Sequence, residues 1–70
     1  MNKHTLTAVI HREEDMYVAE CPEVGTVSQG ETVEKAVENL REATELYLEE
    51  FPLAEIEKPI LTVFKVSAHA

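Results

Sequence analysis

Hydrophobic and polar positions alternate with a period of two at the start of the chain, which is typical of half-buried β-strands. In residues 4–11, Leu6, Ala8 and Ile10 fall on one face and the threonines fall on the other. Residues 16–21 alternate in the same way, after four charged residues. The pattern predicts two antiparallel strands over 4–11 and 16–21, joined as a hairpin.

Pro22 and Gly25 mark the end of the second strand, because proline cannot donate a hydrogen bond to a sheet ladder. Residues 26–29 lie between this turn and Gly30. The run is too short for its periodicity to be decisive. Its position between two turn signals predicts a short edge strand over 26–29.

Apolar residues then recur at helical spacing from 33 to 51, which predicts a long amphipathic helix. Thr32 has the side chain of an N-cap, and Pro52 ends the helix because the residue before a proline is pushed out of the helical region. We expect one arc of this helix to cover the sheet: Val33, Ala36, Val37, Leu40, Ala43, Thr44, Tyr47, Leu48 and Phe51.

Residues 60–66, ILTVFKV, are rich in β-branched and aromatic side chains and predict a fourth strand that is apolar on both faces. The predicted order is β-β-β-α-β in a single α+β domain over residues 1–70. A three-stranded antiparallel meander carries one helix on one face, and the fourth strand returns parallel to the first by a right-handed crossover. Because one helix leaves the other face uncovered, we expect a homodimer or higher homo-oligomer.

The composition indicates a folded domain, since 44% of the 70 residues are apolar. No apolar run is long enough for a membrane span, and the first residues lead into no signal-peptide core, so we expect a cytoplasmic protein with no membrane contact. Cys21 is the sole cysteine and is predicted to be a small buried side chain rather than a reactive thiol.

The formal net charge is −8, with fourteen Asp and Glu against six Lys and Arg. Such a surface repels phosphate backbones, and the chain has no cluster of basic residues to overcome the repulsion. Direct binding of nucleic acid is therefore not expected, and a basic protein is the more natural partner.

The sequence contains few groups of residues with the spacing of a catalytic or metal-binding site. His4, His11 and His69 are dispersed and show no metal-ligand spacing, so neither a metal nor another cofactor is expected. The β-β-β-α-β order is also that of the first part of the ribonuclease H fold, whose enzymes hold divalent metals with carboxylates. Asp15, Glu20 and Glu23 would be the candidates here, but three acidic groups among fourteen are expected by chance. We expect no enzyme and no catalytic residue, with a metal-dependent nuclease as the least favoured alternative.

One stretch of the chain resembles the HicB family of antitoxins, and the match covers about half of the sequence. The residues that carry the resemblance are Tyr17, Ala19, Cys21, Pro22 and Glu23, then Gly25, Ser28-Gln29-Gly30-Glu31-Thr32, Glu34, Ala36, Asn39, Glu42, Ala43, Tyr47 and Leu48.

The resemblance implies a partial ribonuclease H-like domain without nuclease activity. It also implies a HicA-like partner, a small basic toxin that cleaves mRNA. The turn from Pro22 to Gly25 is one residue shorter than the family's usual turn and lacks its second proline. Many members also carry a C-terminal DNA-binding segment. No such segment follows the predicted fourth strand in this sequence, so we do not expect this chain alone to bind promoter DNA.

An acidic antitoxin would place carboxylates where RNA phosphates lie on the toxin, and so occlude its basic surface. Two groups of residues are candidates for this contact, although each carboxylate alone could simply be a solvated surface charge. They are Glu20, Glu23 and Glu31 around the turns, and Glu38, Glu42, Glu45 and Glu49 on the helix together with Leu46. The alternative function is a stand-alone dimeric module that regulates or binds a small ligand without a toxin.

Overall fold

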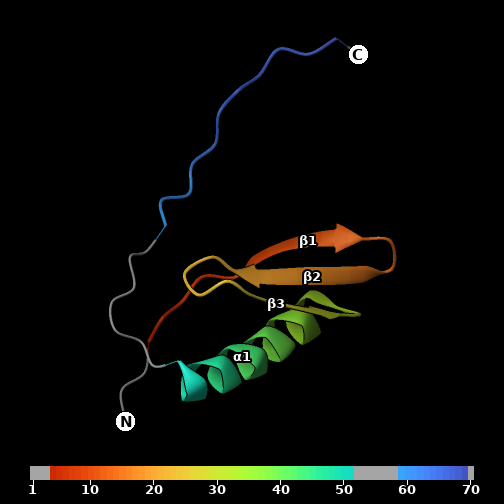
Figure 1. Ribbon diagram of the computed structural model, residues 1–70. Helices are drawn as coiled ribbons and strands as arrows, with labels where there is room; N and C mark the ends of the chain where they lie inside the picture. The colour runs from red at the N-terminus through yellow and green to blue at the C-terminus, as the bar shows by residue number, and fades with distance from the viewer. Residues whose placement is uncertain (1–3, 52–58, 70) are drawn as a thin grey trace.

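The computed structural model describes residues 4–51 and 59–69. Within these ranges it contains three strands, β1 (Val9–Glu13), β2 (Met16–Cys21) and β3 (Thr26–Gly30), and one helix, α1 (Val33–Glu50). The strands form an antiparallel sheet in the order β1-β2-β3. The helix lies across one face, mainly against β3 and then β2, so that β1 is the strand farthest from it (Figure 1). The predicted α+β arrangement of a three-stranded meander followed by one helix is confirmed.

The first strand begins at Val9 instead of residue 4, so the predicted bounds are wrong there. The reason is that the Thr7 backbone N–H donates to both carboxylate oxygens of Glu23, each at 3.0 Å, instead of joining the ladder. At its other end β1 continues to Glu13, because only Glu14 and Asp15 form the loop. Glu14 has a φ of 54°, a left-handed conformation that allows this tight connection.

The core lies between the sheet and the helix and is small. Ala19, Cys21, Ala36 and Leu40 are its buried apolar residues, and four half-buried side chains pack around them: Leu6, Ile10, Tyr17 and Val24. The predicted burial of Cys21 is confirmed. Burial raises the pKa of its thiol, and the nearby Glu23 carboxylate adds to this effect, so the thiol stays protonated.

The helix begins as predicted, with Thr32 as its N-cap. The Thr32 hydroxyl accepts a hydrogen bond from the Lys35 backbone N–H at 3.0 Å. Just before it, Gly30 brings β3 close against the first turn, and a Cβ atom there would lie 2.5 Å from the Ala36 nitrogen. Only glycine allows this approach of strand to helix.

The inner face of α1 is narrower than the predicted arc. Ala36, Leu40 and Thr44 are buried, whereas four members of the arc are exposed: Val33, Val37, Tyr47 and Phe51. The helix has 18 residues and is about 27 Å long. Five residues of β3 span only about 17 Å, so the helix, which begins directly after β3, extends past the sheet at its C-terminal end, where Tyr47 and Phe51 lie (Figure 1). The assignment of the whole arc to the sheet is therefore wrong.

The structure does not show the predicted fourth strand over 60–66. Residues 59–69 are extended, belong to no strand, and project away from the sheet and helix (Figure 1). Ile60 and Val63 are more than nine-tenths exposed. A strand needs a ladder partner and a surface on which to bury its side chains, and within the described chain this segment has neither. The predicted connector over 52–58 lies outside the described residues.

Candidate protein-binding surface

Four glutamates form a continuous stripe along α1: Glu38, Glu42, Glu45 and Glu49. They are separated by four, three and four residues, and this spacing places side chains above one another on a helix. The stripe lies on the side opposite Leu40, which packs into the core. All four side chains are exposed. The structure thus brings together the helical half of the predicted site, which we call the acidic stripe.

No member of the acidic stripe forms an ion pair with another residue of 4–51 or 59–69. Lys35 and Arg41 are the cationic residues of α1, and both are exposed. Neighbouring carboxylates at these spacings repel one another and destabilise an isolated helix slightly. A cationic partner would relieve this repulsion.

Leu46 lies beside Glu42 on the outer side of the helix and is 64% exposed. It is the apolar residue predicted to lie next to the acidic side chains, and the structure places it there. Whether a partner contacts Leu46 stays a prediction. An apolar side chain within a charged surface is the usual arrangement of an interface centre surrounded by a polar rim.

Glu23 has a different environment from the other candidates. Its carboxylate accepts hydrogen bonds from the Thr7 backbone N–H and from the Thr7 hydroxyl, the latter at 2.7 Å. The Cys21 thiol donates to it at 3.5 Å. Desolvation acts to raise the pKa of Glu23, but the bonds from Thr7 outweigh it and hold the pKa below its usual value. Glu23 therefore ties residue 7 to the β2–β3 turn, and its oxygens are already occupied.

The structure does not bring Glu20, Glu23 and Glu31 together. Glu20 points to the face of the sheet that α1 leaves open, since Ala19 and Cys21 on either side of it face the core. Glu31 lies at the opposite end of β3 from Glu23, just before the helix. Of the two candidate groups, only the helical one forms a continuous surface.

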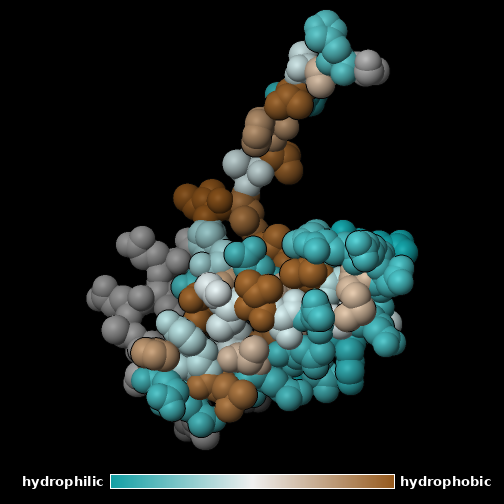
Figure 2. Space-filling model, turned by 45° about the vertical axis from the view of Figure 1, so that its right-hand side comes forward, coloured by the Kyte–Doolittle hydropathy of each residue, from teal (hydrophilic) through white to brown (hydrophobic). Residues whose placement is uncertain are grey.

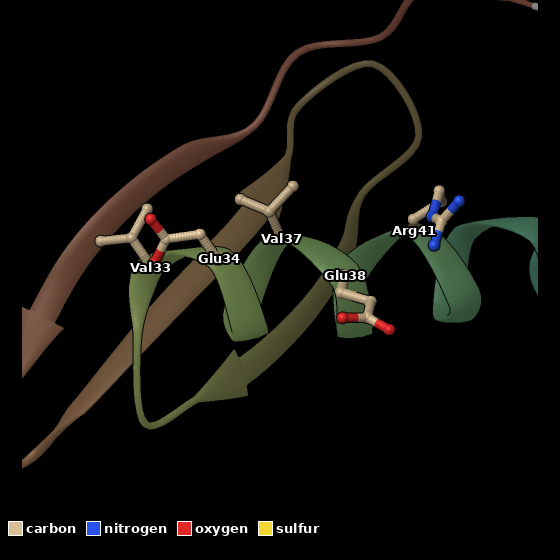
Figure 3. A pocket seen from close by; sticks show the side chains of 5 residues that line it. All are labelled: Val33, Glu34, Val37, Glu38 and Arg41. Carbon is tan, nitrogen blue, oxygen red and sulfur yellow. The ribbon is translucent and has the colours of Figure 1, made fainter.

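A hollow of about 420 Å³ lies on the first half of α1, lined by Val33, Glu34, Val37, Glu38 and Arg41 (Figure 3). All five residues come from the helix, so no second element closes the hollow over a small ligand. Val33 and Val37 project on the same side of the helix in this view. These two exposed valines are part of the surface that sequence reasoning missed, because periodicity assigned them to the core. Val37 lies about 60° round the helix from Leu40, so its place at the edge of the arc could have indicated its partial exposure.

The carboxylates considered for a nuclease are far apart. Asp15 precedes β2 and Glu23 follows it, so the six residues of that strand separate them by about 20 Å. Across residues 4–51 and 59–69, no three His, Cys, Asp or Glu side chains gather in a way that could hold a metal ion. In the same ranges, no helix has the length and apolar character of a membrane span.

The fold and its charged helix define a small acidic α+β domain. By sequence comparison, the chain belongs to the UPF0150 family. It is 44% identical over 55 residues to a UPF0150 protein of Synechocystis sp., an alignment that covers 76% of this chain and 80% of the relative. A UPF0150 protein of Helicobacter pylori is 48% identical over 44 residues, which are 61% of each chain. No family model and no solved structure matches the chain.

Proposed function

We propose that this protein is a HicB-like antitoxin that neutralises a small basic HicA-like toxin by occluding its RNA-binding surface. The observation that carries the proposal is the acidic stripe. It is exposed, continuous and unpaired within the described chain, and it stands on a rigid helix. The proposed partner is a protein, and no direct contact with nucleic acid is included.

The HicB-like sequence pattern supports the proposal in a second way. Its residues lie in one continuous unit, β2 to α1, and several have structural roles in that unit. Gly30 permits the close approach of β3 to the helix, and Thr32 caps the helix. The Asn39 side chain donates to the Gln29 carbonyl at 2.8 Å. The pattern therefore describes the scaffold that presents the stripe.

The proposed mechanism is steric and electrostatic. Carboxylates at the spacing of the stripe would occupy cationic sites on the toxin that otherwise bind phosphates, and Leu46 would supply a desolvated centre. Long-range attraction would speed association, and salt would slow it. No step in this mechanism requires catalysis by the antitoxin. Since the toxin cleaves mRNA, the complex would form in the cytoplasm, with the antitoxin as a homodimer or larger homo-oligomer.

The direct test is to look for a short reading frame beside this gene that encodes a basic protein, and to co-express that protein with this chain. If that basic protein arrests growth when it is expressed alone, this chain should restore growth and co-purify with it. A pair in which neither rescue nor co-purification occurs would refute the antitoxin proposal and favour the stand-alone regulatory module. RNA cleavage by this chain that requires Mg²⁺ or Mn²⁺ and is lost in Asp15→Asn would instead establish the nuclease.

The contact surface has its own test. Charge reversal in the double variant Glu42→Lys, Glu45→Lys should slow association with the toxin and reduce its dependence on salt. The double variant Glu13→Lys, Asp15→Lys changes the net charge equally but lies at the β1–β2 turn, away from the stripe. Equal binding by both variants would place the interface on another surface. Loss of binding in Glu20→Lys or Glu31→Lys would identify that surface.

A further inference from the structure

The C-terminal segment 60–66 has the properties of a strand without a sheet. Five of its seven residues are apolar, and each is at least 66% exposed: Ile60, Leu61, Val63, Phe64 and Val66. Figure 2 shows brown and tan side chains, alternating with paler ones, along a segment that stands clear of the body. Large contiguous apolar surfaces of this kind mark sites of association.

The outer edge of β1 is the place where such a segment can bind. In the observed register Glu13 pairs with Met16 across a two-residue loop, so hydrogen-bonded pairs alternate along the hairpin from there. The N–H and C=O groups of Ile10 and Arg12 then point away from β2. No described strand pairs with this edge of β1. It is an open template for one more strand.

The edge of β3 is less accessible. The same alternation turns the Gln29 carbonyl outward from β2, and the Asn39 side chain already donates to it at 2.8 Å. The helix also packs most closely against β3, as Figure 1 shows. Asn39 and the adjacent helix thus obstruct part of this edge, and β1 is the more open edge of the sheet.

The side chains of β1 suit a strand that is apolar on both faces. Ile10 is half-buried beside the core on the helix side, and Val9 is 41% exposed on the open side. An added strand would place one set of its alternating side chains next to Ile10. The other set would lie next to Val9, where it extends the open face that also carries Val18 and Val27.

We propose that segment 60–66 of one copy adds to the outer edge of β1 of a second copy, and that mutual exchange of these segments forms a two-fold symmetric dimer. This gives a specific geometry to the homo-oligomer proposed above and does not depend on the toxin. The occupant is a second copy because the chain's own segment lies away from its own sheet, with its apolar side chains in solvent. Each dimer would carry two acidic stripes.

The decisive experiment is cross-linking of mixed isotopes. Full-length chains with Val9→Cys and Val63→Cys, one batch labelled with ¹⁵N, are denatured, mixed, refolded and treated with a flexible bis-maleimide. Cys21 is 2% exposed and should not react. Mass spectrometry should find links between positions 9 and 63, and about half of them should join a heavy to a light chain. Links only within chains, or a protein that sediments as a monomer at micromolar concentration, would overturn the proposal.

A matched pair of variants tests the energetic role of the segment. Leu61 is 66% exposed and Leu46 is 64% exposed, so replacement of either by lysine changes a similarly accessible leucine. Leu61→Lys should weaken dimerisation by at least about 10-fold in sedimentation equilibrium, and Leu46→Lys should leave it nearly unchanged. Circular dichroism checks that both are folded. Equal effects would overturn the assignment to β1, and if Leu61→Lys fails to fold, the cross-links decide.

Discussion

The two faces of α1 differ in burial and in charge. On the inner face Ala36, Leu40 and Thr44 are buried against the sheet. On the outer face the acidic stripe makes no ion pair within the described chain, and its carboxylates repel one another. The inner face stabilises the fold by packing against the sheet. The outer face presents charged groups that a partner could bind, and their mutual repulsion slightly destabilises the fold. Residues on the two faces should therefore respond differently to mutation.

The largest effect should come from the core leucine. Leu40→Ala removes a side chain that is 5% exposed, and we expect the free energy of unfolding to fall by about 2–5 kcal/mol. Leu46→Ala, on the outer face of the same helix, should change it by less than about 0.5 kcal/mol. Urea denaturation of both variants measures the difference. Similar losses would mean that the outer leucine is also buried in solution, most directly by another copy.

A smaller loss is expected from the hydroxyl pair that joins the helix to β3. Thr44 and Thr26 share a hydrogen bond of 2.7 Å between their Oγ1 atoms. Thr44→Val should cost about 0.5–1.5 kcal/mol, because it leaves the Thr26 hydroxyl without this partner. The double variant Thr26→Val, Thr44→Val should recover part of that loss. A double-mutant cycle without coupling energy would show that the bond is not formed in solution.

Neutralising substitutions in the acidic stripe should raise the free energy of unfolding, whereas the substitutions above lower it. Glu42→Gln together with Glu45→Gln removes the like-charge neighbours within the stripe and should raise the unfolding free energy by a few tenths of a kcal/mol. The gain should disappear near 1 M salt, where the charges are screened. The same variant should bind a basic partner more weakly. A loss of stability instead would indicate that the stripe is paired within the protein.

The effect of Glu23, which we expect to be the smallest of the four, should depend on pH and disappear in acid. Its pKa is lowered in the folded state, so the charged carboxylate is favoured on folding. That contribution is complete above the ordinary glutamate pKa of about 4.3 and is lost as pH falls through the lower folded-state pKa. Glu23→Gln should therefore be less stable than the natural protein at pH 7, and the gap should close in acid. Thr7→Val, which retains the backbone donor, should show a smaller gap of the same sign.

Elements with strong local signals could be predicted from the sequence. The bounds of β2 agree with the prediction, and α1 ends one residue earlier than expected. The N-cap of the helix was also predictable, because the Thr32 hydroxyl bonds only three residues away. In each case the determining interaction is local, so the order of residues alone contains it.

Features that depend on distant contacts could not be predicted. The start of β1 is set by a bond between residues 7 and 23, which no periodicity reveals. The same bond gives Glu23 a structural role that composition could not distinguish from that of a surface charge. The exposure of Tyr47 and Phe51 depends on where the sheet ends beneath the helix. Residues 60–66 belong to no strand in the described chain, because a strand depends on a distant pairing partner that the local pattern of β-branched residues does not specify.

The topology of the domain has a consequence for the order in which it folds and assembles. The main contacts join elements that follow one another, β1 with β2, β2 with β3 and β3 with α1, and the remaining α1–β2 contact spans only β3 and its turns. Contacts of low sequence separation form quickly, because little chain entropy is lost in closing them. The sheet and helix should therefore fold rapidly as one unit. Under the proposed strand exchange, assembly with a second chain would be the slower, concentration-dependent step.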